Sequence, residues 1–96
     1  MTKELLNAIK NVLKVRVDRG NYGMLSNVNA SMRDLRLLHE NDIDVYFDRS
    51  FNGKSNVIVQ GGEIIGVIKR KYASKKVNGM YKELQPKIEW LEEERL

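Results

Sequence analysis

The chain has 96 residues, with 17 Lys and Arg against 13 Asp and Glu, and its formal net charge is +4. This length predicts a single domain over residues 1–96. The absence of cysteine excludes disulfides, thiolate metal sites and thiol nucleophiles. The sequence shows neither a signal peptide at its start nor an apolar stretch of membrane-spanning length, so we expect a cytoplasmic protein.

The positive charge is concentrated in the middle of the chain. Residues 51–76 hold six Lys and Arg against Glu63 alone, whereas residues 21–50 and 77–96 each hold three Lys and Arg against five acids. This asymmetry predicts a positive patch that faces an anionic partner, although mild basicity also keeps many domains soluble. Lys, Asn and Ile are abundant and Ala is scarce, a bias of AT-rich coding that points to a bacterium or its phage or prophage.

Helical periodicity dominates the first part of the chain. Thr2 can cap a helix that we expect to end at Asp18 to Gly20. Its apolar stripe consists of Leu5, Leu6, Ile9, Val12, Leu13 and Val17. Residues 21–29 are rich in Gly, Asn and Ser and predict a loop with one helical turn. A second helix is predicted from Ser31 to about Asn41.

The period of the apolar residues then changes to two, which predicts strands. Ile43, Val45 and Phe47 alternate with polar or half-polar residues in the first strand. Two turn signals follow, an Asn-Gly and a Gly-Gly dipeptide, and they predict an antiparallel meander of three strands. The turns are placed at Asn52-Gly53 and Gly61-Gly62, the second strand at Val57 to Val59 and the third at Glu63 to Ile68.

A last helical pattern is predicted from about Ser74. Its stripe consists of Val77, Tyr81, Leu84, Ile88 and Leu91. Pro86 interrupts the stripe, so the segment is either one kinked helix or a short helix followed by a new one that begins at Pro86. The predicted fold class is therefore α+β, with two N-terminal helices, a three-stranded antiparallel meander and a C-terminal helical segment kinked near Pro86.

The residues that commonly carry catalysis do not assemble into a motif. His39 is the only histidine, and no recognisable metal or acid–base partner lies near it in the sequence. One common nuclease pattern needs Glu-x-Lys on a strand, but Glu63 is followed two residues later by Ile65. We therefore expect a protein that is not an enzyme, with no cofactor and no metal site.

The run from Arg33 to Ile43, followed by a strand and the Asn52-Gly53 hairpin, resembles a known family. It is similar to the end of the recognition helix, and the wing, of winged-helix DNA-binding domains of the DeoR and biotin-repressor kind. The resemblance covers residues 33–60. It implies that the second helix lies in the major groove and that the hairpin touches the DNA backbone or minor groove. By this resemblance the DNA contacts would come from Arg33 and Arg36 on the helix and from Arg49 and Lys54 on the wing.

The densest group of positive charges lies further on, around Arg70. Lysines there would neutralise phosphates, and one tyrosine beside them would stack on a base. The residues of this candidate patch are Lys69, Lys71, Tyr72, Lys75 and Lys76. Lysines at the end of an edge strand also block unwanted strand pairing, and the two roles are compatible.

Together these patterns predict a small nucleic-acid-binding regulator, with DNA favoured over RNA as its partner. The alternative is a protein-interaction module, such as a phage or prophage factor that docks on a host protein and inhibits it. The apolar stripe after Val77 also predicts a homodimer formed through the C-terminal helical segment.

Overall fold

The structure is a computed structural model that describes residues 1–18 and 31–91. Helix α1 covers Lys3–Asp18. The predicted cap is confirmed, because the backbone N–H of Leu5 donates to Thr2 Oγ1 at 3.2 Å. The predicted apolar stripe is largely buried in the core, most completely at Ile9 and Leu13. The predicted helix end at Gly20 and the predicted loop over residues 21–29 lie outside the described residues.

The second predicted helix is confirmed as α3, Met32–Glu40, which packs against α1. Ser31 precedes it in an extended conformation, but within the described residues its side chain makes no capping hydrogen bond. Asp34 instead accepts a hydrogen bond from Asn11 Nδ2 of α1 at 3.0 Å, which ties the two helices together. At the other end, Asn41 Nδ2 donates to the carbonyl oxygen of Leu37 at 2.8 Å.

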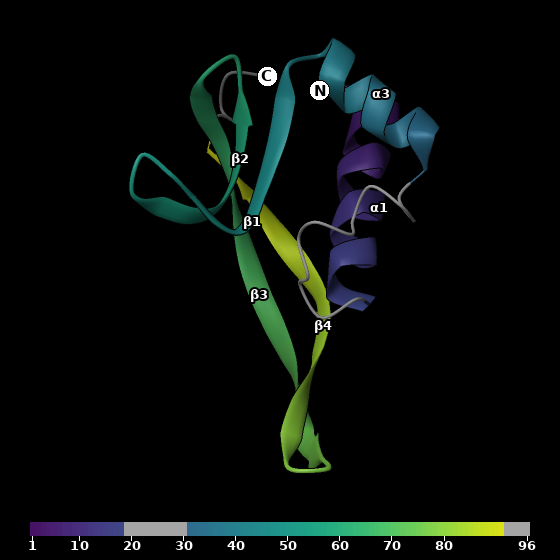
Figure 1. The fold of residues 1–96 in the computed structure, drawn as a ribbon, viewed down its shortest axis with the longest axis vertical. Coiled ribbons are helices and arrows are strands. Elements are labelled where there is room, and N and C mark those ends of the chain that lie inside the picture. Colours follow the sequence, from purple (N-terminus) through teal and green to yellow (C-terminus); the bar gives the residue numbers. More distant parts are fainter. Residues whose placement is uncertain (19–30, 92–96) are drawn as a thin grey trace.

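The strands of the described residues form one antiparallel sheet in the order β1-β2-β3-β4 (Figure 1). Their bounds are β1 Ile43–Phe51, β2 Lys54–Gln60, β3 Glu63–Val77 and β4 Met80–Trp90. Two-residue turns connect them, and both residues of each turn have positive φ, as tight hairpins between twisted strands require. These turns are Asn52–Gly53, Gly61–Gly62 and Asn78–Gly79, of which the first two were predicted.

The α+β class is correct, but the prediction of three strands followed by a C-terminal helical segment is wrong. Residues 80–90 form strand β4, and β3 continues nine residues beyond the predicted end at Ile68, to Val77. A proline in a strand removes a ladder hydrogen bond, and it is tolerated at a bulge. Such a bulge exists here, since Leu84 pairs with Lys71 and Lys87 pairs with Lys69, so two residues including Pro86 lie opposite one.

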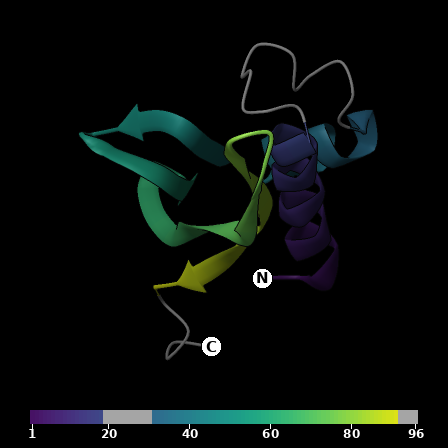
Figure 2. The same cartoon turned by 90° about the horizontal axis from the view of Figure 1, so that it is seen from below.

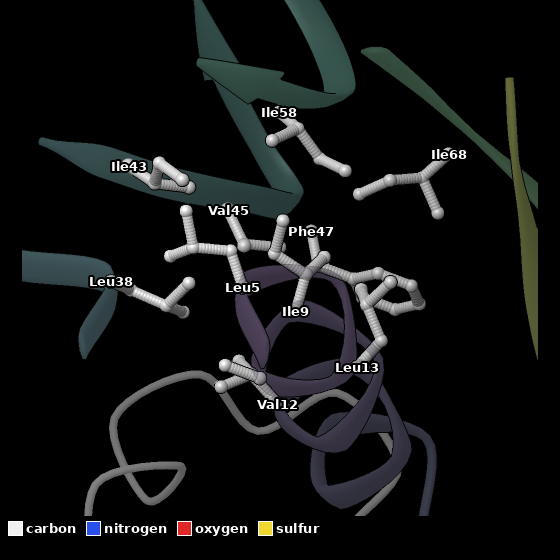
Figure 3. Packing of buried hydrophobic residues seen from close by; sticks show 11 residues of the cluster. Leu5, Ile9, Val12, Leu13, Leu38, Ile43, Val45, Phe47, Ile58 and Ile68 are labelled. Atoms are coloured by element: carbon white, nitrogen blue, oxygen red, sulfur yellow. The ribbon is translucent and has the colours of Figure 1, made fainter. Parts of the chain in front are cut away.

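The core lies between the helices and one face of the sheet (Figure 3). Ile9 and Leu13 of α1 meet Phe47 of β1 and Ile58 of β2, and all four side chains are at most 1% exposed. Ile68 of β3 completes this layer. The body of the molecule is thus built from α1, α3, and the parts of the sheet that pack against them.

None of the helices in the described ranges combines the length and the apolar character that crossing a membrane requires.

Candidate nucleic-acid interface

Strands β3 and β4 continue past the core as a two-stranded hairpin, which we call the arm and define as residues 69–87. The last pair that contributes to the core is Ile68 with Ile88, and the next pair, Lys69 with Lys87, is exposed. The arm projects from the body along the long axis of the molecule (Figure 1). Figure 2 views it end-on, with α1 on one side and the β1–β2 hairpin on the other.

The net positive charge of the protein is concentrated in the arm. Residues 69–87 hold seven Lys and Arg against a single acid, Glu83, which gives a net charge of +6. The remaining residues therefore sum to −2, given the total of +4. The positive side chains of the arm are Lys69, Arg70, Lys71, Lys75, Lys76, Lys82 and Lys87. The six lysines are all exposed.

Arg70 is the exception, because it fastens the arm to the body. Its Nε donates to Glu83 Oε2 at 2.7 Å and its Nη2 to Glu83 Oε1 at 2.6 Å, which joins β3 to β4. Its Nη1 contacts Asp48 of β1, and its guanidinium carbon lies 4.9 Å from the ring centre of Phe47. The hydrogen bonds to Glu83 raise the pKa of Arg70 above its ordinary value, outweighing the opposite effect of its partial burial.

The strand register gives the arm two different faces. Tyr72 pairs with Glu83, and Lys76 pairs with Tyr81. Paired residues share a face, and so do residues two apart on one strand. We call this side the tyrosine face; it comprises Arg70, Tyr72, Lys76, Tyr81 and Glu83.

The opposite side, the apolar face, follows from the pairs Val77 with Met80 and Lys71 with Leu84. Lys82 lies between Met80 and Leu84 on β4 and points the same way. Val77, Met80 and Leu84 are 65%, 72% and 40% exposed. Both faces thus carry positive side chains beside large exposed ones: Lys76 and Arg70 lie on the tyrosine face, and Lys71 and Lys82 on the apolar face. The rings lie on the tyrosine face alone.

The arginines implied by the winged-helix resemblance lie elsewhere. Arg33 and Arg36 are exposed on α3, at the opposite end of the molecule from the tip of the arm (Figure 1). They line a hollow of about 260 Å³ together with two glutamates, Glu4 and Glu40. Residues 31–42 hold two arginines against three acids, so the net charge of this segment is −1. This segment of the chain therefore does not concentrate positive charge.

The two predicted wing residues lie on the β1–β2 hairpin. Lys54 is exposed at the start of β2. Arg49 Nη2 donates to the carbonyl oxygen of Val45 at 3.2 Å, and its guanidinium carbon lies 4.9 Å from the ring centre of Tyr46. Arg49 also affects Arg16 on α1. The pKa of Arg16 is lowered, mainly because its own side chain is partly buried and to a smaller extent because Arg49 repels its charge.

The structure therefore divides the predicted site residues into three groups. Lys69, Lys71, Tyr72, Lys75 and Lys76 share the arm, Arg49 and Lys54 share the β1–β2 hairpin, and Arg33 and Arg36 share α3. Three residues of the arm were missed: Tyr81, Lys82 and Lys87. The Asn78–Gly79 dipeptide would have revealed them, since it is the same hairpin signal as Asn52–Gly53.

Comparison with protein-family models, with curated proteins and with solved structures finds no match. The winged-helix resemblance therefore stays a prediction. The segment that carries it, residues 33–60, forms α3, β1 and β2. A helix-turn-helix also requires a helix before the recognition helix, and the residues that would have to form it, 20–30, lie outside the described part of the chain. Within the described ranges, no group of three or more acidic or histidine side chains is placed to hold a metal ion.

Proposed function

We propose that this protein is a non-enzymatic nucleic-acid-binding protein that uses the arm as its binding surface. The observation that carries the proposal is the net charge of +6 on one exposed hairpin, in a protein whose other residues sum to −2. DNA is the favoured partner, and the proposed role is that of a small cytoplasmic regulator.

The physical basis is the release of counterions. Each lysine that meets a phosphate displaces a condensed cation, so binding weakens as salt rises. The arm presents its lysines along two strands and on both faces, while Arg70 is held in place by Glu83 and Asp48. The lysines, and not Arg70, are therefore the groups available for phosphates.

The test compares neutralised lysines of the arm with neutralised arginines of α3. We expect the triple variant Lys71→Gln, Lys75→Gln and Lys76→Gln to weaken binding of a labelled oligonucleotide. The slope of log K against log salt should become shallower by about two to three units, since each lost phosphate contact removes about 0.7–0.9. Fluorescence anisotropy across a salt series measures both effects.

The matched control is the double variant Arg33→Gln with Arg36→Gln. We expect it to bind with nearly the affinity of the wild type. If this variant loses binding while the triple variant keeps it, helix α3 is the binding element, as the winged-helix resemblance implies, and the proposal for the arm is wrong.

Docking on another protein is a second candidate function, favoured by the exposure of Val77 and Met80 at the tip. Binding to a protein through these apolar side chains would persist at high salt, whereas phosphate-driven binding would not. The predicted homodimer through a C-terminal helical segment is not proposed again, because residues 80–90 form strand β4 and not a helix.

A further inference from the structure

We infer that the tyrosine face of the arm binds single-stranded nucleic acid, with one base stacked on Tyr72 and another on Tyr81. This inference rests on the proposed nucleic-acid function and specifies the form of nucleic acid that the arm selects. It follows from the position of the two rings, from the charges beside them and from the contrast with the apolar face.

The two rings are neighbours on one face. Tyr72 lies directly opposite Glu83, and Tyr81 is two residues from Glu83 on the same strand. Diagonal neighbours of this kind lie roughly 7–8 Å apart, with their Cβ atoms somewhat closer, which leaves each ring its own surface. Both tyrosines are 51% exposed, so each has ring surface available to a base.

A positive group accompanies each ring. The guanidinium carbon of Arg70 lies 5.8 Å from the ring centre of Tyr72, and Lys76 Nζ lies 5.3 Å from the ring centre of Tyr81. A nucleotide presents a flat base and, one sugar away, a negative phosphate. Lys76 is therefore placed to meet the phosphate of a base stacked on Tyr81, whereas Arg70 beside Tyr72 is held by Glu83 and Asp48 and leaves the phosphates to the lysines of the arm.

Stacking on these rings requires bases whose flat surfaces are free. In a duplex the neighbouring base pairs already cover those surfaces, whereas a single strand exposes them. The apolar face offers Val77, Met80 and Leu84, which have no rings on which a base can stack. The selectivity for single strands is therefore assigned to Tyr72 and Tyr81.

The competing arrangement is a groove-bound arm, because the major groove of DNA also admits a two-stranded ribbon. That mode would use the lysines of both faces and would favour a duplex. The two modes share the salt dependence of the proposed function, and they differ in the strand form that they prefer and in the part played by the rings.

The experiment measures binding of the full chain to a labelled thymidine oligonucleotide and to a blunt duplex of matched length. We expect the single strand to bind more tightly. Tyr72→Ala and Tyr81→Ala should each weaken its binding by at least about fivefold, the lower limit for a lost stacking contact. The salt slope should stay unchanged in both variants, because no phosphate contact is removed.

Two controls separate stacking from damage to the hairpin. Tyr72→Phe with Tyr81→Phe keeps both rings and should retain most of the affinity. Val77→Ser with Met80→Ser alters the apolar face alone and should bind the single strand as the wild type does. Circular dichroism of each variant checks that the sheet is intact.

Equal or tighter binding of the duplex, unaffected by loss of the rings, would overturn this inference and leave the proposed function standing. Loss of binding in the Val77→Ser and Met80→Ser variant, with the tyrosine variants unaffected, would also overturn it. If the wild type retains neither oligonucleotide at low salt, the proposed function fails and the inference fails with it.

Discussion

The body and the arm use similar residues for opposite purposes. In the body, the apolar side chains of alternating strand positions are buried, as at Val45, Phe47 and Ile68. In the arm, which continues one of the same strands, Tyr72 and Val77 are at least half exposed. Large side chains that leave half or more of their surface exposed contribute less to folding than buried ones. The arm is therefore the part of the molecule in which sequence change should affect binding more than stability.

Arg70 marks the boundary between the two regions. It occupies the strand position two residues after Ile68, on the side of the sheet that faces the core. The guanidinium lies over the Phe47 ring, so a charged group follows the last core side chain of β3 on this side of the sheet. Its bonds to Glu83 and Asp48 connect the arm to the body through three strands.

The largest expected loss of stability comes from a substitution in the core of the body. Phe47→Ala should lower the free energy of unfolding by about 3–5 kcal/mol, because a fully buried aromatic ring leaves a cavity. Met80→Ala, a truncation in the arm, should change it by less than about 0.5 kcal/mol. Urea denaturation followed by circular dichroism measures both values. A Met80→Ala cost close to that of Phe47→Ala would show that the arm packs against something in solution, such as a second copy.

The second largest loss of stability is expected at Arg70, between the body and the arm. Arg70→Met should cost about 2 kcal/mol, since it removes charge-assisted hydrogen bonds that are partly shielded from water. Lys71→Met is the matched control, because the neighbouring side chain is exposed and makes no such contact among the described residues. The same urea measurement applies. Equal costs for the two variants would mean that Arg70 does not fasten the arm.

A smaller loss of stability than at Arg70 is expected in the turn at the tip of the arm. Gly79 has a φ of +79°, so Gly79→Ala should strain the turn by about 1 kcal/mol. We expect faster amide hydrogen exchange in β3 and β4 near the turn, with the protection of α1 unchanged. Gly66→Ala is the matching glycine substitution in the body. Its added Cβ would lie 3.0 Å from Trp90 Cε3, which is closer than an ordinary van der Waals contact. Uniform loss of protection in the Gly79→Ala variant would show that the arm and the body unfold together.

The parts of the fold that the sequence predicted correctly are those with one dominant signal. The helix periodicity of Leu5 to Leu13 and the alternation from Ile43 to Phe47 have no competing pattern. Residues 77–91 carry two signals, a helical spacing of apolar residues and the Asn78–Gly79 turn. The turn prevails because the long β3 strand pairs with β4 along its length, at Met80, Tyr81, Leu84, Ile88 and Trp90. That partner is visible only when the fold is known.

The candidate site was predictable in part for the same reason. The lysines of residues 69–76 form a charge cluster that is visible in the sequence itself. The role of Arg70 depends on Asp48 and Glu83, which are 22 and 13 positions away and reach it only through the sheet register. Tyr72 and Tyr81 likewise share a face only because β4 pairs with β3. Contacts across strands cannot be deduced from local spacing.

The two-residue turns also determine how the chain reaches this structure. Each strand pairs with its neighbour in sequence, so closing each hairpin costs little loop entropy and hairpins form within microseconds. Docking α1 on the sheet is different, because it joins segments that are far apart in the sequence. Gln85 Nε2 donates to the carbonyl oxygen of Lys10 at 3.2 Å, across 75 positions. We therefore expect the sheet to form early and the docking of α1 to set the folding rate.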